Sequence, residues 1–365
     1  MLIISLAVAA GALGLSTLCV AGSRRWAVER MLDIPNARSS HTRPTPRGGG
    51  LGIVIGVLIG TWGLFFSRIM STPFREIMAL SLGGGIVAMV GWLDDIHNVP
   101  TRVRLIVQAV SSIIILIAIG YFNALTVPII GDIRLYSIGI PFTLIWIIGL
   151  TNAYNFMDGI DGIAGGQAVV AGLAWMIIGL MSGQSFFGLI GVLLGASSLG
   201  FLFHNWPPAR IFMGDVGSAF IGFTLAVLPI IAARRNPRFM FAGMLVVWPF
   251  IFDTSFTLVR RLVNRENIFV AHRSHIYQRL VTSGYSHRFV TLIYIGLASI
   301  GTVIALLWYK RAPFVNIVVI VLPILLFAGL WRLTVRAELR AHSGAQQLIL
   351  TVNRKRAERN KGLMK

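Results

Sequence analysis

Long apolar segments alternate with short polar ones along most of the chain. A helix needs about 20 mostly apolar residues to cross a bilayer. Eleven segments reach or approach that length, at about residues 2–22, 48–67, 76–93, 104–121, 139–155, 163–181, 186–204, 216–233, 239–258, 289–309 and 313–331. The pattern therefore predicts an all-α fold, a polytopic transmembrane helix bundle of about 10 or 11 spans.

The composition agrees with a membrane protein. Of 365 residues, 56% are hydrophobic and 12% are charged, and the mean hydropathy is +0.78. A soluble domain carries about 25% charged residues, so this composition excludes a soluble domain, a disordered chain and a collagen-like repeat. The single cysteine, Cys19, excludes an internal disulfide. We expect one integral-membrane domain over residues 1–335 and a basic cytoplasmic tail at 336–365.

The positive charge indicates an orientation. The chain has 32 Lys and Arg against 13 Asp and Glu, a net charge of +19. We attribute the excess to cytoplasmic loops facing anionic membrane lipid, not to nucleic-acid binding. Arg24 and Arg25 follow the first apolar segment, which favours an anchor with an outer N-terminus and a cytoplasmic C-terminus over a cleaved signal peptide. Three arginines fall on the outer side against this rule: Arg234, Arg235 and Arg238.

In this orientation, the functional loops are expected on the cytoplasmic side, at residues 23–47, 94–103, 156–162, 205–215 and 259–288. The scarce carboxylates gather at or near these loops: Asp94, Asp95, Asp158, Asp161, Asp215 and Asp253. A carboxylate near hydrocarbon is costly unless it is paired or bound to a metal, so these residues are functional candidates. Such hard oxygen ligands suit Mg²⁺, or Mn²⁺.

Each cluster also has a structural interpretation. Asp94 and Asp95 could bind or orient a metal–phosphate complex, one of them could act as a base, or they could cap a helix end. Polar residues recur every third position at Asn152, Asn155, Asp158 and Asp161, where they could bind a nucleotide or form a polar turn. Asp215 lies between glycines just before a predicted helix, which suits a metal ligand or an N-cap.

Two basic loops complete the candidates. In the first loop, His41, Arg47 and Gly49 could hold a phosphate through arginine and backbone donors, or serve charge balance and helix packing. In the last loop, His272, Arg273 and His275 could bind a pyrophosphate. An ordinary interfacial basic loop is the alternative there, and a zinc site has little support because no third soft ligand is adjacent.

Taken together, these motifs resemble the bacterial polyprenyl-phosphate N-acetylhexosamine-1-phosphate transferases, the family of the muramoyl-pentapeptide transferase and the WecA-type enzymes. The resemblance rests on the Asp94-Asp95 pair, the run from Asn155 to Gly162 and the run from Phe212 to Ser218, in this order. The run from Ser39 to Gly50 looks most like the O-antigen-initiating, WbpL- or WecA-type members. The implied reaction transfers sugar 1-phosphate from a UDP-N-acetylhexosamine to undecaprenyl phosphate and releases UMP. The implied location is the cytoplasmic face of the bacterial inner membrane, and the implied cofactor is Mg²⁺. The resemblance is also compatible with a homodimer.

The resemblance also implies residue roles. Asp94 and Asp95 would lie at the reacting phosphates, Asp215 would bind Mg²⁺ with Asp94 and Asp158, and His272 and His275 would match a histidine loop. The further matches are Asn152, Asn155, Asp158 and Asp161 near the nucleotide, the basic stretch with Arg102, Arg104 and Gln108, and His41, Arg47 and Gly49 in the first loop. Two departures stand out: Arg273 and Ser274 separate the two histidines, which argues against a peptide-bearing substrate, and no lysine precedes Lys310.

Other membrane proteins fit less well. A secondary transporter would place its acids near the midplane of inverted repeats, and no repeat is visible here. A CDP-alcohol phosphotransferase would need an arginine soon after Asp-Gly, and the run from Asp161 to Gly165 has none. An aspartate-rich prenyl transferase would need another acid soon after Asp95, where His97 and Asn98 stand.

Overall fold

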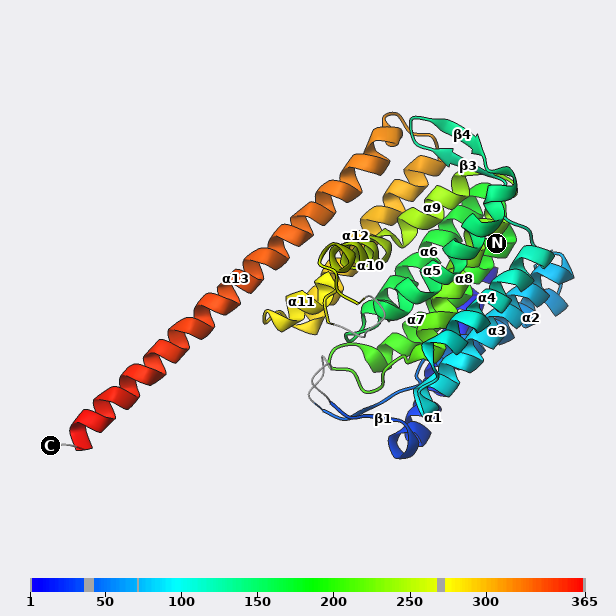
Figure 1. The fold of residues 1–365 in the computed structure, drawn as a ribbon. Helices are drawn as coiled ribbons and strands as arrows, with labels where there is room; N and C mark the ends of the chain where they lie inside the picture. The colour runs from blue at the N-terminus through cyan, green and yellow to red at the C-terminus, as the bar shows by residue number, and fades with distance from the viewer. Residues whose placement is uncertain (1, 36–42, 71, 268–272, 364–365) are drawn as a thin grey trace.

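The computed structural model describes residues 2–35, 43–70, 72–267 and 273–363, with side chains described up to residue 343. Its helices lie side by side as one bundle (Figure 1), which confirms the all-α expectation. The helices are α1 (Leu2–Arg30), α2 (Leu51–Phe66), α3 (Phe74–His97), α4 (Thr101–Ala118), α5 (Gly139–Phe156), α6 (Ile163–Ser182), α7 (Ser185–Asn205), α8 (Asp215–Ala233), α9 (Arg238–Val246), α10 (Trp248–Val263), α11 (Ile276–Thr282), α12 (His287–Tyr309) and α13 (Val315–Leu363). Two antiparallel strand pairs join β1 (Leu32–Asp33) to β2 (Thr45–Pro46), and β3 (Ala124–Val127) to β4 (Gly131–Arg134).

Nine of the described helices are long and apolar enough to cross a membrane: α1, α3 to α8, α12 and α13. Each coincides with a predicted span. The predicted span at 48–67 is α2, whose 16 residues extend about 24 Å and fall short of a bilayer core of about 30 Å. All the predicted segments are therefore helical, but α2 is short for a full crossing.

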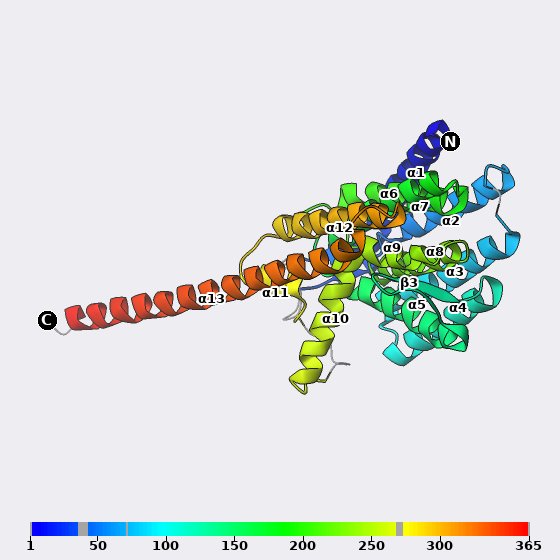
Figure 2. The ribbon, with the colours of Figure 1, turned by 90° about the horizontal axis from the view of Figure 1, so that it is seen from above.

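The predicted span at 239–258 is helical but is not one straight helix. The segment forms two helices, α9 and α10, which meet at Val247 with a bend of 78°. Pro249 explains the break, because it lacks an N–H group and its ring would clash with the carbonyl one turn earlier. Figure 2 shows α10 leaving the direction of the bundle at this point.

Two helices are longer than the sequence pattern predicts. Helix α3 continues to His97, so Asp94 and Asp95 lie in its last turns and not in a loop. Helix α13 continues from the last predicted span into the predicted tail, as one helix of 49 residues. Its C-terminal part projects far beyond the bundle (Figures 1 and 2).

Glycines bring α6 and α7 into close contact. A Cβ atom on Gly172 of α6 would lie 2.5 Å from the Cα of Gly195 and 2.5 Å from the carbonyl oxygen of Gly191, both in α7. Small residues let membrane helices approach closely enough for backbone packing. This glycine face fixes the central pair of helices on which the loops of the site are mounted.

The three outer arginines are partly explained by their partners. Arg234 donates to Glu76 at 2.6 Å, at the opposite end of α3 from Asp94 and Asp95. Arg238 stacks on Trp308 with its guanidinium carbon 4.5 Å from the ring centroid, and donates to the Trp308 carbonyl. Arg235 is exposed. Two of the three thus join helices together.

We expect Gly172→Ala to lower the stability of the protein. The added methyl group overpacks the α6–α7 contact, at a cost of about 1–3 kcal/mol. Thermal unfolding of the full chain in detergent measures the loss. Gly149→Ala is the matched control, because nothing lies within 4 Å of a Cβ atom at that position in α5. Equal melting temperatures for the two variants would contradict the packing role of Gly172.

Candidate functional site

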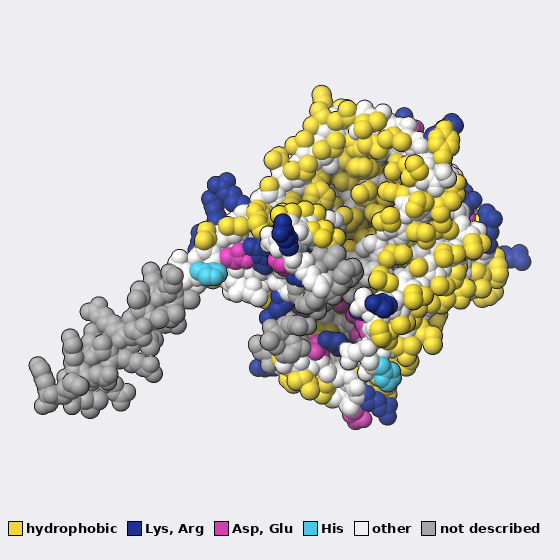
Figure 3. Space-filling view, in the orientation of Figure 1, with side chains coloured by type: hydrophobic (Ala, Val, Ile, Leu, Met, Phe, Trp, Pro, Cys, Tyr) yellow, Lys and Arg dark blue, Asp and Glu magenta, His cyan; other side chains and the backbone are white. Residues whose placement is uncertain are grey.

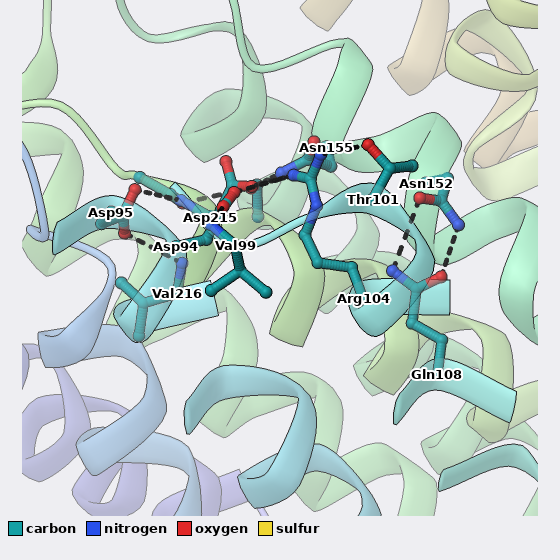
Figure 4. Close-up of polar contacts among 12 residues, drawn as sticks. Asp94, Asp95, Val99, Thr101, Arg104, Gln108, Asn152, Asn155, Asp215 and Val216 are labelled. Carbon is teal, nitrogen blue, oxygen red and sulfur yellow. Dashed lines mark hydrogen bonds and ion pairs between the residues drawn. The ribbon is translucent and has the colours of Figure 1, made fainter. Parts of the chain in front are cut away.

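The two adjacent aspartates make different contacts (Figure 4). Asp94 accepts hydrogen bonds from the Val99 amide at 2.5 Å and from Arg104 Nη1 at 2.8 Å. Asp95 accepts from the amides of Asp215 at 2.9 Å and Val216 at 3.2 Å. Those amides begin α8 and have no partner within the helix, and the positive end of the helix dipole favours a carboxylate there. Asp95 therefore fastens α3 to the start of α8.

Two glycines allow this contact. A Cβ atom on Gly91 would lie 2.5 Å from the carbonyl oxygen of Asp215. A Cβ atom on Gly214 would collide with the carboxylate of Asp95, and Gly214 has a φ of +76° that disfavours other residues. The glycine before Asp215 is thus required for the backbone to reach Asp95.

Arg104 links the two helix ends from a third helix, α4. Its Nη1 atom lies 2.8 Å from Asp94 Oδ2 and 2.8 Å from Asp215 Oδ2 (Figure 4). Carboxylates this close repel each other, and a shared cation offsets the repulsion. The structure therefore brings together Asp94 and Arg104 with Asp215, which the sequence placed in a separate loop.

Asp158 and Arg47 add charge to this cluster. Burial, and then the carboxylates of Asp215 and Asp95, raise the pKa of Asp158 well above its ordinary value. Arg47 pairs with Asp33 at 2.7 Å. Burial alone would lower the pKa of Arg47, but Asp33 and the more distant Asp95 and Asp215 raise it. We call Asp94, Asp95, Asp158 and Asp215 the carboxylate cluster; Arg47 and Arg104 are the cations that act on it.

The amides of α5 lie beside the cluster. Asn152 donates to Gln108 at 2.6 Å, and Asn155 donates to Ser218 at 2.9 Å. Both asparagines line a recess of about 20 Å³ with Arg104, Gln108 and Asp215. That volume suits about one water molecule. Asn152 and Asn155 therefore hold α4, α5 and α8 together around the cluster. This structural role is separate from the predicted contact with the nucleotide.

Asp161 is engaged elsewhere. Its carboxylate accepts from the Ala209 amide at 3.0 Å and lies 3.3 Å from His287 Nδ1. It thereby joins the loop after α5 to the loop after α7 and to the start of α12. His287 was missed in the sequence. It lies within the predicted loop 259–288, but no motif pointed to it.

The residues predicted in the two basic loops and at the start of α4 differ in burial and in their contacts. His275 is only 4% exposed, caps α11 and lies 3.3 Å from Asp253, while Arg273 is half-buried. Gly49 packs against the backbone of Phe212. Arg102 is exposed on the first turn of α4, and His41 and His272 lie outside the described residues.

The cluster suits a divalent cation in charge and in ligand type. Its four carboxylates exceed the two neighbouring guanidinium groups, and hard oxygen ligands are those that Mg²⁺ prefers. Over the described ranges, no three His, Cys, Asp or Glu side chains converge to hold a metal ion by themselves. Mg²⁺ often binds through one or two carboxylates together with substrate phosphates, and Asp94 and Asp215 are the two carboxylates that lie closest to Arg104.

Most of the hydrophobic side chains in view cover the body of the bundle, and the acidic ones in view gather mainly at its lower end (Figure 3). A polar site at the end of an apolar bundle can receive a water-soluble substrate from one side.

Comparisons with known proteins agree with this arrangement. Residues 77–233 match the family described as Glycosyl transferase family 4. The chain is 33% identical over 267 residues to the "Probable undecaprenyl-phosphate N-acetylglucosaminyl 1-phosphate transferase" of Bacillus subtilis, covering 72% of this chain and 73% of the relative. It is 32% identical over 308 residues to the "Decaprenyl-phosphate N-acetylglucosaminephosphotransferase" of Mycolicibacterium smegmatis, covering 73% of each chain. It is 30% identical over 254 residues to the "Undecaprenyl-phosphate alpha-N-acetylglucosaminyl 1-phosphate transferase" of Thermotoga maritima, covering 68% of this chain and 74% of the relative.

The raised pKa of Asp158 predicts a pH-dependent cost to stability. Between the ordinary value of 3.8 and the raised pKa, the folded protein keeps a proton that the unfolded chain releases, so stability falls as the pH rises. Asp158→Asn removes this cost. We expect its melting temperature in EDTA to exceed that of the unsubstituted protein at pH 8, and the gain to shrink toward pH 5.

Asp132→Asn controls for the change of a carboxylate to an amide. Asp132 is exposed on β4, at the other end of α4 from Arg104. A gain for Asp158→Asn that is the same at pH 5 and pH 8 would contradict the electrostatic explanation.

Proposed function

This chain belongs to glycosyl transferase family 4, and on that basis we propose that it transfers N-acetylhexosamine 1-phosphate from a UDP-sugar to undecaprenyl phosphate, with release of UMP. The observation that carries the proposal is the bridge from Arg104 to Asp94 and Asp215, within a carboxylate cluster at the end of an apolar bundle. Such a site suits a reaction between a soluble diphosphate and a phosphate anchored in the membrane.

The first donor to test is UDP-N-acetylglucosamine. The three relatives described above carry N-acetylglucosamine in their names. Donors with GalNAc, FucNAc or QuiNAc are the alternatives, because a few side chains around a sugar can change the preference among such similar groups. We place the reaction at the cytoplasmic face of the bacterial inner membrane, as the first step of an O-antigen or another cell-envelope polysaccharide.

In the proposed reaction, an oxygen of the lipid phosphate attacks the phosphorus that carries the sugar. The new P–O bond forms as the bond to the bridging oxygen breaks, and that oxygen leaves with UMP. Reactions of this kind depend mainly on positioning and on stabilisation of charge.

We infer a different role for each residue from its contacts. Asp95 is committed to the start of α8, so Asp94, which shares Arg104 with Asp215, is the member of the pair that orients the lipid phosphate. Arg104 and Arg47 stabilise phosphate charge. We assign Asp158 to the donor nucleotide, since it directly follows α5 and its amide donates to the Asn155 carbonyl.

One or two carboxylates from the set Asp215, Asp94 and Asp158 would hold Mg²⁺ together with the substrate phosphates, since no three acidic side chains of the described residues converge on one point. When bound, the ion would neutralise the diphosphate and stabilise the leaving UMP. It would also favour the ionised form of Asp158, whose pKa the neighbouring carboxylates raise.

The proposal is tested by UMP release. The purified full chain in detergent receives undecaprenyl phosphate, Mg²⁺ and one of several UDP-N-acetylhexosamines, with and without EDTA. We expect UMP from one donor, and loss of that signal in EDTA. Asp215→Asn and Asp94→Asn should each lower the rate at least about 100-fold, because each removes a charge at the reacting phosphates.

Asp132→Asn should keep the rate of the unsubstituted protein. Full activity in folded Asp215→Asn would refute the metal assignment. If no donor gives UMP, a thermal-shift titration with UDP tells whether the nucleotide binds at all: no shift would overturn the proposed reaction, and a shift would direct the test to rarer sugars.

A further inference from the structure

Helix α11 has only seven residues, and its N-terminal end is built on a buried carboxylate. Asp253 is 0% exposed and accepts from the amides of Ile276 at 2.9 Å and Tyr277 at 3.2 Å. The Tyr294 hydroxyl donates to it at 2.5 Å, and His275 Nδ1 lies 3.3 Å away. A helix of this length is not stable by itself, and its position therefore depends on contacts such as those to Asp253.

Tyr277 connects α11 to the segment that contains Asp158. Its hydroxyl donates to the Phe156 carbonyl at 2.9 Å, and its ring lies where a side chain on Gly159 would be. Burial and the carboxylates of Asp253 and Asp158 raise the pKa of Tyr277, so the hydroxyl keeps its proton and remains a donor. A shift of α11 would therefore move the residues that follow Phe156.

The other end of α11 is fastened to the terminal helix. Arg279 donates from Nε to Glu338 Oε1 at 2.6 Å and from Nη2 to Glu338 Oε2 at 2.5 Å. Its guanidinium carbon lies 4.5 Å from the ring centroid of Trp331, which packs against Phe256 of α10 at 4.7 Å. Bidentate arginine–carboxylate pairs combine strength with fixed geometry. The Arg279 and Glu338 side chains are only 14% and 29% exposed, so solvent screens this pair incompletely.

We propose that Arg279 and Glu338 are positioning residues for the transfer reaction. Helix α13 holds α11 through this pair, and α11 in turn holds residues 157–162 through Tyr277, so that Asp158 faces the donor nucleotide. The role of Asp158 toward the nucleotide rests on the proposed function. The contacts that join α13, α11 and residues 157–162 do not depend on it. Through the Arg279–Glu338 pair, α13 helps to hold the site in position, although α13 lies outside the residues that match the family.

Hydrogen–deuterium exchange on the full chain in detergent tests the link directly. Glu338→Gln removes the charge and one strong acceptor. We expect about tenfold faster exchange at residues 276–282 and at 157–162, since hydrogen bonds to charged groups have about this effect on local opening. The amides of Asp158 and Gly162 report on the second segment, because they are bonded to Asn155 and Asn205.

Glu76→Gln is the matched control. It breaks an ion pair of similar length, 2.6 Å to Arg234, at the other end of α3. It should lower thermal stability without changing exchange at 157–162. Exchange at 157–162 that is unchanged in Glu338→Gln, or raised equally in Glu76→Gln, would overturn the proposal.

Kinetics give a second readout that a general loss of stability would not move. Glu338→Gln should raise the KM for the UDP-sugar about threefold to tenfold, while kcat and the KM for the lipid change less than about twofold. The double variant Arg279→Glu with Glu338→Arg restores an ion pair and should recover most of the exchange protection. A KM for the UDP-sugar that does not change would contradict the positioning role.

One outcome separates this inference from the proposed function. Faster exchange at 157–162 in a protein that neither transfers sugar phosphate nor binds UDP would support the link and refute the reaction. If Glu338→Gln does not fold, Arg279→Lys replaces it, because lysine keeps the charge but cannot form the bidentate pair. Its exchange at 157–162 should be intermediate, and unchanged exchange would overturn the link.

Discussion

The site depends on one electrostatic requirement: several carboxylates lie together at the end of an apolar bundle, and each needs a compensating partner. Asp95 finds its partner in the free amides at the start of α8. Asp94 and Asp215 share the guanidinium of Arg104. These contacts tie α3, α4 and α8 together, so the groups proposed for chemistry also hold the helix ends in place. Burial and the neighbouring carboxylates of Asp215 and Asp95 raise the pKa of Asp158.

Close helix packing allows the carboxylates of the cluster to reach their partners. Gly91 lets α3 approach the backbone of Asp215, and Gly214 leaves room for the carboxylate of Asp95. Farther from the site, Gly172 allows α6 and α7 to meet backbone to backbone. Lipid supplies little hydrophobic driving force between helices, so small residues and specific polar pairs determine which faces meet. The pair of Arg234 with Glu76 serves this purpose at the opposite end of α3.

The last third of the chain contacts the loop that contains Asp158. The break at Val247 turns α10 away from the bundle, and α11 then returns toward the loop of Asp158. Buried Asp253 fixes the start of α11, while Glu338 fixes its far end from α13. Residues 77–233, which match glycosyl transferase family 4, include all four aspartates of the carboxylate cluster. The attachment of α11 to the terminal helix is a property that the family match at residues 77–233 does not include.

The sequence by itself determined the helical segments, the end of the bundle where the carboxylates gather, and the resemblance to the family. Hydrophobicity and short motifs are local properties, so they can be read along the chain. Only the tertiary structure decided that Asp161 pairs with His287, that His275 is buried against Asp253, and that Arg104 joins two distant aspartates. Such pairings depend on which helix faces meet and where the chain bends. Those outcomes arise from contacts between residues far apart in sequence, and no local pattern records them.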